Sequence, residues 1–168
     1  YNNFSYSMIK SPDKNFLLFG DMENAAGFTD GLIIKVDTSG NKIWEKIFPG
    51  GGYRDTFNWI EQLPDSSFIA SGCYNWASGG QGWILKLDTA FNVQWQRLRS
   101  YSPAGRTVYT CVKPAIDGGF VLTGTYDLLN GTAIVTKTDN LGFEQWTKYF
   151  YPEGYNLPSN TLIQEIIP

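Results

Sequence analysis

The stretch KVDTSGNKIW, from Lys35 to Trp44, recurs twice in similar form at one fixed interval. It returns as KLDTAFNVQW from residue 86 and as KTDNLGFEQW from residue 137, each copy 51 residues after the one before. The residues that keep this step are Lys35, Lys86 and Lys137; Asp37, Asp88 and Asp139; and Trp44, Trp95 and Trp146. A second set, upstream in each copy, is Asp13, Asp65 and Asp117; Phe16, Phe68 and Phe120; and Gly20, Gly72 and Gly124. Such a period indicates a repeat architecture.

Each repeat is predicted to form four short strands and no helix. In the second copy the strands are FNWIEQLP, SFIASGCY, GWILKLDT and VQWQRLRS. Turn sequences such as PDKN, PDSS and IDGG separate them, because Asp bonds its own backbone and Gly accepts a positive φ. The middle copy has Phe91 where the others have Gly40 and Gly142. Either Asn92 takes the left-handed position there, or that turn is of another type.

The third strand of a repeat, LIIKV or WILKL, is apolar on both faces, which predicts a sheet packed between two others. A four-stranded sheet of ~50 residues buried by copies of itself is a β-propeller blade. We therefore expect an all-β fold with three four-stranded antiparallel blades at 1–51, 52–103 and 104–152, and the first strand of a further blade at 153–168. Propellers close with ~4–8 blades. We expect an excerpt of a larger ring, or a chain that assembles with others to close one.

The composition argues against several functional classes. The formal net charge is −3 and no basic run exists, which argues against nucleic acid as a partner. The sequence has no apolar run of ~18 residues, so no membrane-spanning segment is predicted. Histidine is absent, which removes the commonest general base and the commonest zinc ligand. Cys73 and Cys111 are either a disulfide or two buried thiols.

Two blocks carry a family resemblance that covers essentially the whole chain. DGLIIKVDTSGNKIWEKIFPGGGYRD, followed by LPDSSFIASG, resembles the bacterial β-propeller repeat of secreted and surface proteins. The resemblance implies a propeller in an extracellular or cell-surface protein, and some members are exported by type IX secretion. Copy three departs at the linker, with YSPAGR, and copy two has Gln81 where copy one has Asp30. Quinoprotein dehydrogenases use a similar Gly-x-x-x-Trp step to lock their blades, so Trp44, Trp95 and Trp146 are expected to pack against neighbouring blades.

The repeated lysines interrupt apolar strands at one structural position. One reading is a ring of ammonium groups that lines a channel and holds an anion. The favoured reading is a lysine that snorkels or pairs with the aspartate two residues on, on the same face of its strand. The pairs expected in that case are Lys35 with Asp37, Lys86 with Asp88, and Lys137 with Asp139.

The loop between the second and third strands of each repeat is the candidate binding region. In copy two it reads CYNWASGGQG and carries Tyr74 and Trp76; the matching loops carry Phe28 in copy one and Tyr126 in copy three. Aromatic side chains at one rim can stack on sugars or anchor a protein partner, whereas the alternative is that they cap the gaps between blades.

No nucleophile motif is present, so we expect no catalytic residue, no metal site and no cofactor. The sequence favours an extracellular or surface propeller that acts as a scaffold or binding module for a protein or a glycan. The alternative is a non-catalytic portion of a carbohydrate-active or quinone-type propeller enzyme whose active residues lie outside this chain.

Overall fold

The computed structural model describes residues 3–50, 54–76, 79–101, 105–127 and 132–150. These residues form three four-stranded antiparallel sheets and no helix, so the prediction of an all-β fold with four strands in each repeat is confirmed. The predicted strand at 153–168 lies outside the described residues.

Each sheet is a meander whose strands pair in chain order. Sheet 1 contains β1 (Asn3–Lys10), β2 (Phe16–Glu23), β3 (Thr29–Val36) and β4 (Lys42–Phe48). Sheet 2 contains β5 (Thr56–Gln62), β6 (Phe68–Tyr74), β7 (Gln81–Leu87) and β8 (Val93–Arg99). Sheet 3 contains β9 (Arg106–Pro114), β10 (Phe120–Asp127), β11 (Thr132–Thr138) and β12 (Glu144–Phe150).

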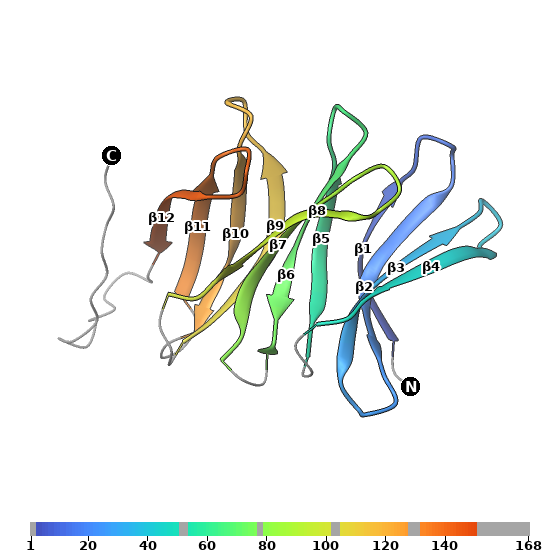
Figure 1. Cartoon of the computed structure of the whole chain (residues 1–168), viewed down its shortest axis with the longest axis horizontal. Coiled ribbons are helices and arrows are strands. Elements are labelled where there is room, and N and C mark those ends of the chain that lie inside the picture. The colour runs from blue at the N-terminus through green and yellow to red at the C-terminus, as the bar shows by residue number, and fades with distance from the viewer. Residues whose placement is uncertain (1–2, 51–53, 77–78, 102–104, 128–131, 151–168) are drawn as a thin grey trace.

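The three sheets stand side by side in chain order, with sheet 2 between the other two (Figure 1). Strand β5 contacts β1, β2 and β3, and β9 contacts β5, β6 and β7. The hairpins that join the first to the second strand and the third to the fourth lie at the upper end of the view, here called the hairpin end. The opposite end, at which the second strands end and the third strands begin, is here called the loop end.

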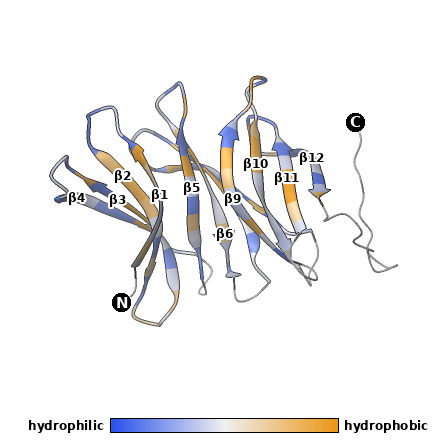
Figure 2. Cartoon of the chain, turned by 180° about the vertical axis from the view of Figure 1, so that it is seen from behind, coloured by the Kyte–Doolittle hydropathy of each residue, from blue (hydrophilic) through white to orange (hydrophobic). Residues whose placement is uncertain are grey.

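Two apolar clusters hold the sheets together, and sheet 2 contributes to both. Its strand β7 alternates, because Trp83 and Leu85 join the cluster shared with sheet 1 while Ile84 joins the cluster shared with sheet 3. This agrees with the prediction of a strand that is buried on both faces. Apolar segments fall mainly within the strands, as the orange stretches of β2, β9 and β11 show (Figure 2).

A glycine in the third strand makes room for an aromatic ring of the next sheet. A Cβ atom at Gly31 would lie 2.7 Å from the ring of Phe57, and one at Gly82 would lie 2.5 Å from the ring of Tyr109. The two sheet interfaces are therefore built on the same aromatic-on-glycine contact.

The turn at Phe91 corrects both sequence alternatives. Phe91 itself has a φ of 61°, and the turn makes the same backbone hydrogen bonds as the turns at Gly40 and Gly142. The left-handed conformation costs a non-glycine residue roughly 1–2 kcal/mol. The phenyl ring offsets this cost, because it stacks on Phe68 at 4.6 Å and packs against Trp44 of sheet 1 at 5.1 Å.

The repeated tryptophans lie on the outer strands and are half-buried. Trp44 reaches sheet 2 through Phe91, and Trp95 reaches sheet 3 through Phe120, at a ring separation of 6.0 Å. Trp146, in the last sheet, has the ammonium of Lys148 5.8 Å from its ring.

The expected partner of each repeated lysine was wrong. Lys35 pairs with Asp13, Lys86 with Asp65 at 3.6 Å, and Lys137 with Asp117 at 2.7 Å. Each partner lies in the first hairpin of the same sheet, because register places Lys35 opposite Leu17 at the start of β2. Asp37, Asp88 and Asp139 instead accept backbone N–H groups of their own turns, at 2.7–2.9 Å.

Both cysteines are free thiols, so the disulfide alternative is wrong; the alternative of two buried thiols holds for Cys73, whereas Cys111 is half-buried. Cys73 is buried, and this burial raises its pKa to about 12. A thiol with such a pKa is not a nucleophile at neutral pH.

Candidate functional site

The candidate site is a cavity of about 450 Å³ at the loop end, where the first strands of the three sheets lie next to one another. Its walls come from all three sheets, from two loops and from the link between sheets 1 and 2. The residues that line it are Phe4, Tyr6, Asp21, Glu23, Gly27, Thr29, Arg54, Thr56, Asn58, Trp76 and Val108. Ligand pockets commonly measure ~300–1,000 Å³, so this cavity has room for a small ligand.

A β-bulge in the first strand of each sheet aims one side chain away from the regular pattern. The extra residues are Tyr6, Asn58 and Thr110, and each lies beside a glycine of the repeated set. A Cβ atom at Gly20, for example, would lie 1.7 Å from the carbonyl oxygen of Phe4. Because bulges re-aim side chains next to binding sites, two of these three residues, Tyr6 and Asn58, line the cavity.

Tyr6 and Asp21 form the polar wall of the cavity on sheet 1. Tyr6 donates a hydrogen bond of 3.2 Å to Oδ2 of Asp21, which is only 3% exposed. Burial raises the pKa of Asp21, and the Tyr6 hydroxyl, the Arg54 charge and the Phe4 backbone amide offset only part of that effect. The pKa of Tyr6 is also raised, first by burial and then by the carboxylate of Asp21.

Trp76 also lines the cavity, from the start of the β6–β7 loop, and backbone hydrogen bonds hold this segment. Its backbone N–H donates to the Arg54 carbonyl at 2.8 Å, and the N–H of Asn75 donates to buried Asp55 at 2.6 Å. The guanidinium of Arg106 lies 4.8 Å from the centre of the Trp76 ring. The indole is thus held in position while it remains 37% exposed.

The other aromatic residues expected at this rim are placed differently. Phe28 is half-buried in the β2–β3 loop, and Tyr74 packs its ring against Trp83 at 5.5 Å. Tyr126 is 7% exposed and belongs to the core cluster between sheets 2 and 3. Of the four predicted residues, only Trp76 lines the cavity.

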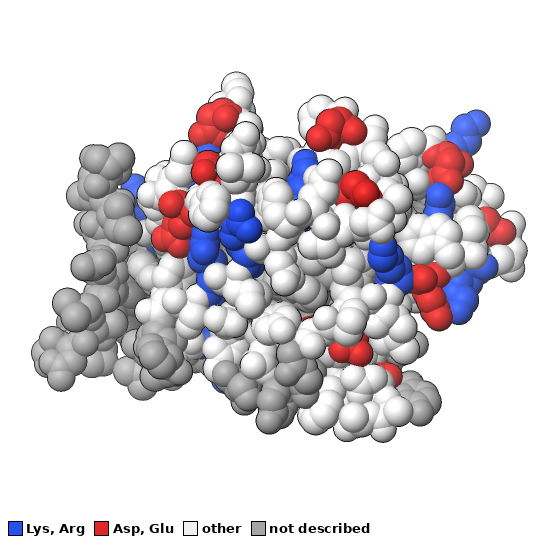
Figure 3. Space-filling model, in the orientation of Figure 1, with Lys and Arg blue, Asp and Glu red and all other residues white. Residues whose placement is uncertain are grey.

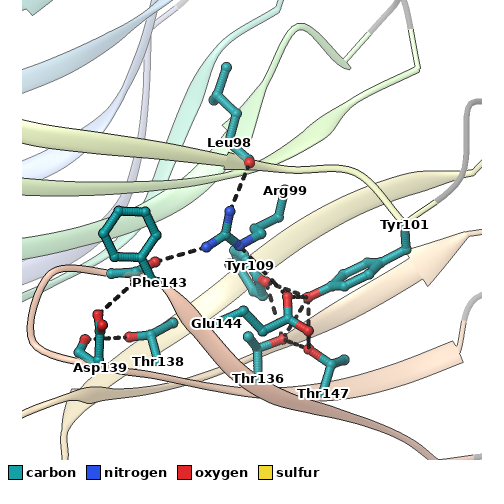
Figure 4. Close-up of polar contacts among 11 residues, drawn as sticks. Leu98, Arg99, Tyr101, Tyr109, Thr136, Thr138, Asp139, Phe143, Glu144 and Thr147 are labelled. Carbon is teal, nitrogen blue, oxygen red and sulfur yellow. Dashed lines mark hydrogen bonds and ion pairs between the residues drawn. The ribbon is translucent and has the colours of Figure 1, made fainter. Parts of the chain in front are cut away.

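A second polar cluster lies between sheets 2 and 3 (Figure 4). The hydroxyl of Tyr101 lies 3.0 Å from that of Tyr109 and 2.8 Å from that of Thr147, and it donates to Glu144 at 3.1 Å. Arg99 adds a hydrogen bond of 2.9 Å to the carbonyl of Gly142. These groups satisfy one another inside the interface, so the cluster joins two sheets rather than presenting groups to a ligand.

The surface has different character at the two ends. In Figure 3 most charged side chains gather over the hairpin end, while the described surface of the loop end is mostly uncharged. Within the described ranges, no three His, Cys, Asp or Glu side chains are grouped to hold a metal ion. The same residues include no helix with the length and apolar character needed to cross a membrane.

Comparison of the chain with known protein families and with curated proteins finds no match.

The sequence pattern did not point to Tyr6, Asp21 or Arg54. A signal for Asp21 existed, because it interrupts the otherwise apolar start of FLLFGDME and the matching positions in the other copies are Cys73 and Thr125. No such signal existed for Tyr6, since a bulge is set by the pairing of two strands and not by one strand alone.

Proposed function

We propose that the three sheets are blades of a β-propeller that serves as a binding or scaffold module outside the cell. The order of strands within each sheet, the face-to-face packing and the repeated contacts between sheets all support this architecture. An extracellular or surface location follows from the resemblance of the repeats to those of exported proteins.

The outward face of sheet 1 supports a further neighbouring blade. Met8 and Ile47 are exposed there, at 59% and 42%. Their equivalents in sheet 2, Ile60 and Leu98, pack against sheet 1. The same apolar pattern thus recurs on a face that lacks a described neighbour, as the successive blades of a ring require.

The observation that carries the binding function is the cavity at the first strands of the three sheets. Two exposed aromatic residues line it: the Tyr6 hydroxyl bonds Asp21, and Trp76 is held by a backbone hydrogen bond to Arg54 and by the Arg106 guanidinium against its ring. Rings that are held in place cost little entropy on binding and are frequent energetic anchors.

The test is binding of the full chain to a neutral oligosaccharide panel and to a random peptide library, with Trp76→Ala as the variant. The matched control is Phe143→Ala, which removes an exposed ring at the hairpin end. We expect at least one ligand class to lose affinity by roughly tenfold or more in Trp76→Ala and to bind the control normally. Turnover of a bound saccharide, or an affinity that Trp76→Ala leaves unchanged, would contradict the proposal.

A further inference from the structure

We propose that the cavity binds one or two rings of an uncharged saccharide, an inference that rests on the proposed binding function and narrows its ligand class. Three kinds of observation carry it: the exposed rings, the unpartnered polar atoms, and the balance of charge around the cavity.

The aromatic residues offer flat apolar faces of the size of a sugar ring. Phe4 and Tyr6 lie on β1 with ring planes 21° apart and centres 6.5 Å apart, and both are about half exposed. Trp76 faces the cavity from the β6–β7 loop. The C–H bonds of a pyranose ring carry a slight positive charge, which suits the negative face of an aromatic ring.

Two polar atoms that belong to residues lining the cavity have no hydrogen-bond partner among the described residues. They are Oδ1 of Asp21 and Oγ1 of Thr29, and both are shielded from solvent. A sugar hydroxyl donates one hydrogen bond and accepts others, so saccharide hydroxyls suit both a carboxylate and a threonine hydroxyl. Buried polar atoms left unpaired are costly, which favours a ligand that supplies such groups.

Tyr6 contacts the other carboxylate oxygen of Asp21, Oδ2. Its hydrogen bond to Asp21 is 3.2 Å long, whereas such O–H···O bonds are commonly ~2.7–2.8 Å. The tyrosine ring is 51% exposed. The hydroxyl of Tyr6 therefore occupies Oδ2 of Asp21, while its ring stays half exposed and can contact a ligand.

The charges around the cavity favour a neutral ligand. Asp21 and Glu23 line it and disfavour an anion, and Arg54 lines it and disfavours a cation. The guanidinium of Arg106 already lies against the Trp76 ring, the group on which a ligand cation would otherwise stack. Hydroxyl groups, in contrast, can pair with both the carboxylates and the guanidinium.

The experiment is titration calorimetry of the full chain with three sets of oligosaccharides. The sets are neutral (gluco-, manno- and xylo-oligosaccharides), anionic (oligogalacturonate) and cationic (chitosan oligosaccharides). The variants are Trp76→Ala, Tyr6→Ala and Asp21→Asn, with Phe143→Ala as the control from the hairpin end. Thermal unfolding of each variant separates lost binding from lost folding.

We expect binding of at least one neutral sugar, with affinity reduced roughly tenfold or more by Trp76→Ala and by Tyr6→Ala. Asp21→Asn is expected to weaken it less, because an amide oxygen still accepts a hydrogen bond. A preference for either charged set overturns the inference. Binding of a peptide through Trp76 instead leaves the proposed function standing and overturns only the ligand class. If Trp76→Ala and Tyr6→Ala weaken neither sugar binding nor peptide binding, both the proposed function and the ligand class are overturned.

Discussion

The two ends of the molecule are built on different rules. At the hairpin end every sheet repeats the same lysine–aspartate ion pair and the same two turns. At the loop end equivalent positions differ from sheet to sheet, as Tyr6, Asn58 and Thr110 show. One end therefore maintains the spacing of the repeats, while the other is free to carry chemistry that differs among them.

The pKa values of aspartates at the two ends are shifted in opposite directions. At the hairpin end, pairing with Lys35 lowers the pKa of Asp13 to about 2, and pairing with Lys137 lowers that of Asp117. At the loop end, burial raises the pKa of Asp21. The charged forms of Asp13 and Asp117 are thus stabilised, whereas burial disfavours the charged form of Asp21 in the candidate site. Such perturbed groups are typical of functional sites.

The largest effect is expected from Phe91, which keeps the hairpin end regular without a glycine. Phe91→Ala should lower the free energy of unfolding by about 3–5 kcal/mol, because it empties a buried aromatic site between sheets 1 and 2. Phe91→Gly should cost less, since glycine relieves roughly 1–2 kcal/mol of left-handed strain. Urea denaturation measures both.

The control for Phe91 is Leu141→Ala, which gives the sheet 3 turn the alanine that sheet 2 has at Ala90. Leu141 is exposed, so a change within about 0.5 kcal/mol is expected. If Phe91→Gly proved as stable as the unaltered chain, the ring would not be what fixes this turn.

At the loop end, a substitution of Asp21 is expected to change the free energy of unfolding by a smaller amount and to raise it. The folded-state pKa of Asp21 is raised, so the carboxyl favours folding at low pH and loses stability as pH rises above its ordinary value of 3.8. Asp21→Asn should therefore stabilise the chain near neutral pH, by about 0.5–2 kcal/mol. The difference should close in acid, where both side chains are neutral.

The measurement is the urea midpoint of both proteins at neutral and at acid pH. Asp13→Asn serves as the contrast, because its lowered pKa predicts a loss of stability at neutral pH. An Asp21→Asn variant that is less stable at neutral pH would mean that the carboxylate of Asp21 is needed in charged form, through its attraction to Arg54.

The strands and turns were predictable because each is indicated by a short sequence pattern, and these patterns recur in all three repeats. Asp37 identifies its own turn, since its carboxylate bonds residues only two and four positions on. The partner of Lys35 was not predictable in this way. Asp13 and Asp37 both recur with the repeat, and only the register of β2 against β3 places Lys35 beside the first hairpin.

The candidate site was predictable only in part, for the same reason. Trp76 was found because a large aromatic residue on a loop is a local signal. Asp21 and Tyr6 meet through a bulge that shifts the pairing of β1 with β2 between Ser5 and Ser7. A single sequence carries neither that shift nor the burial that raises the pKa of Asp21.

The smallest effect on stability is expected from the three ion pairs at the hairpin end, because their aspartates are about half or more exposed and solvent screens the attraction. Their aspartates have lowered pKa values, so the stabilisation is present above 3.8 and is lost as pH falls toward the folded-state values, about 2 for Asp13. Replacing each lysine by methionine keeps the apolar stem and removes the charge. In NMR titrations the pKa of Asp13 and of Asp117 should rise clearly, because the lysine is the main cause of each shift. That of Asp65 should rise least, since Ser67 is its main partner and Lys86 is 3.6 Å away. Equal pKa changes at all three aspartates, or no change at any, would contradict the claim that the lysine is the main cause of the shift at Asp13 and Asp117 but not at Asp65.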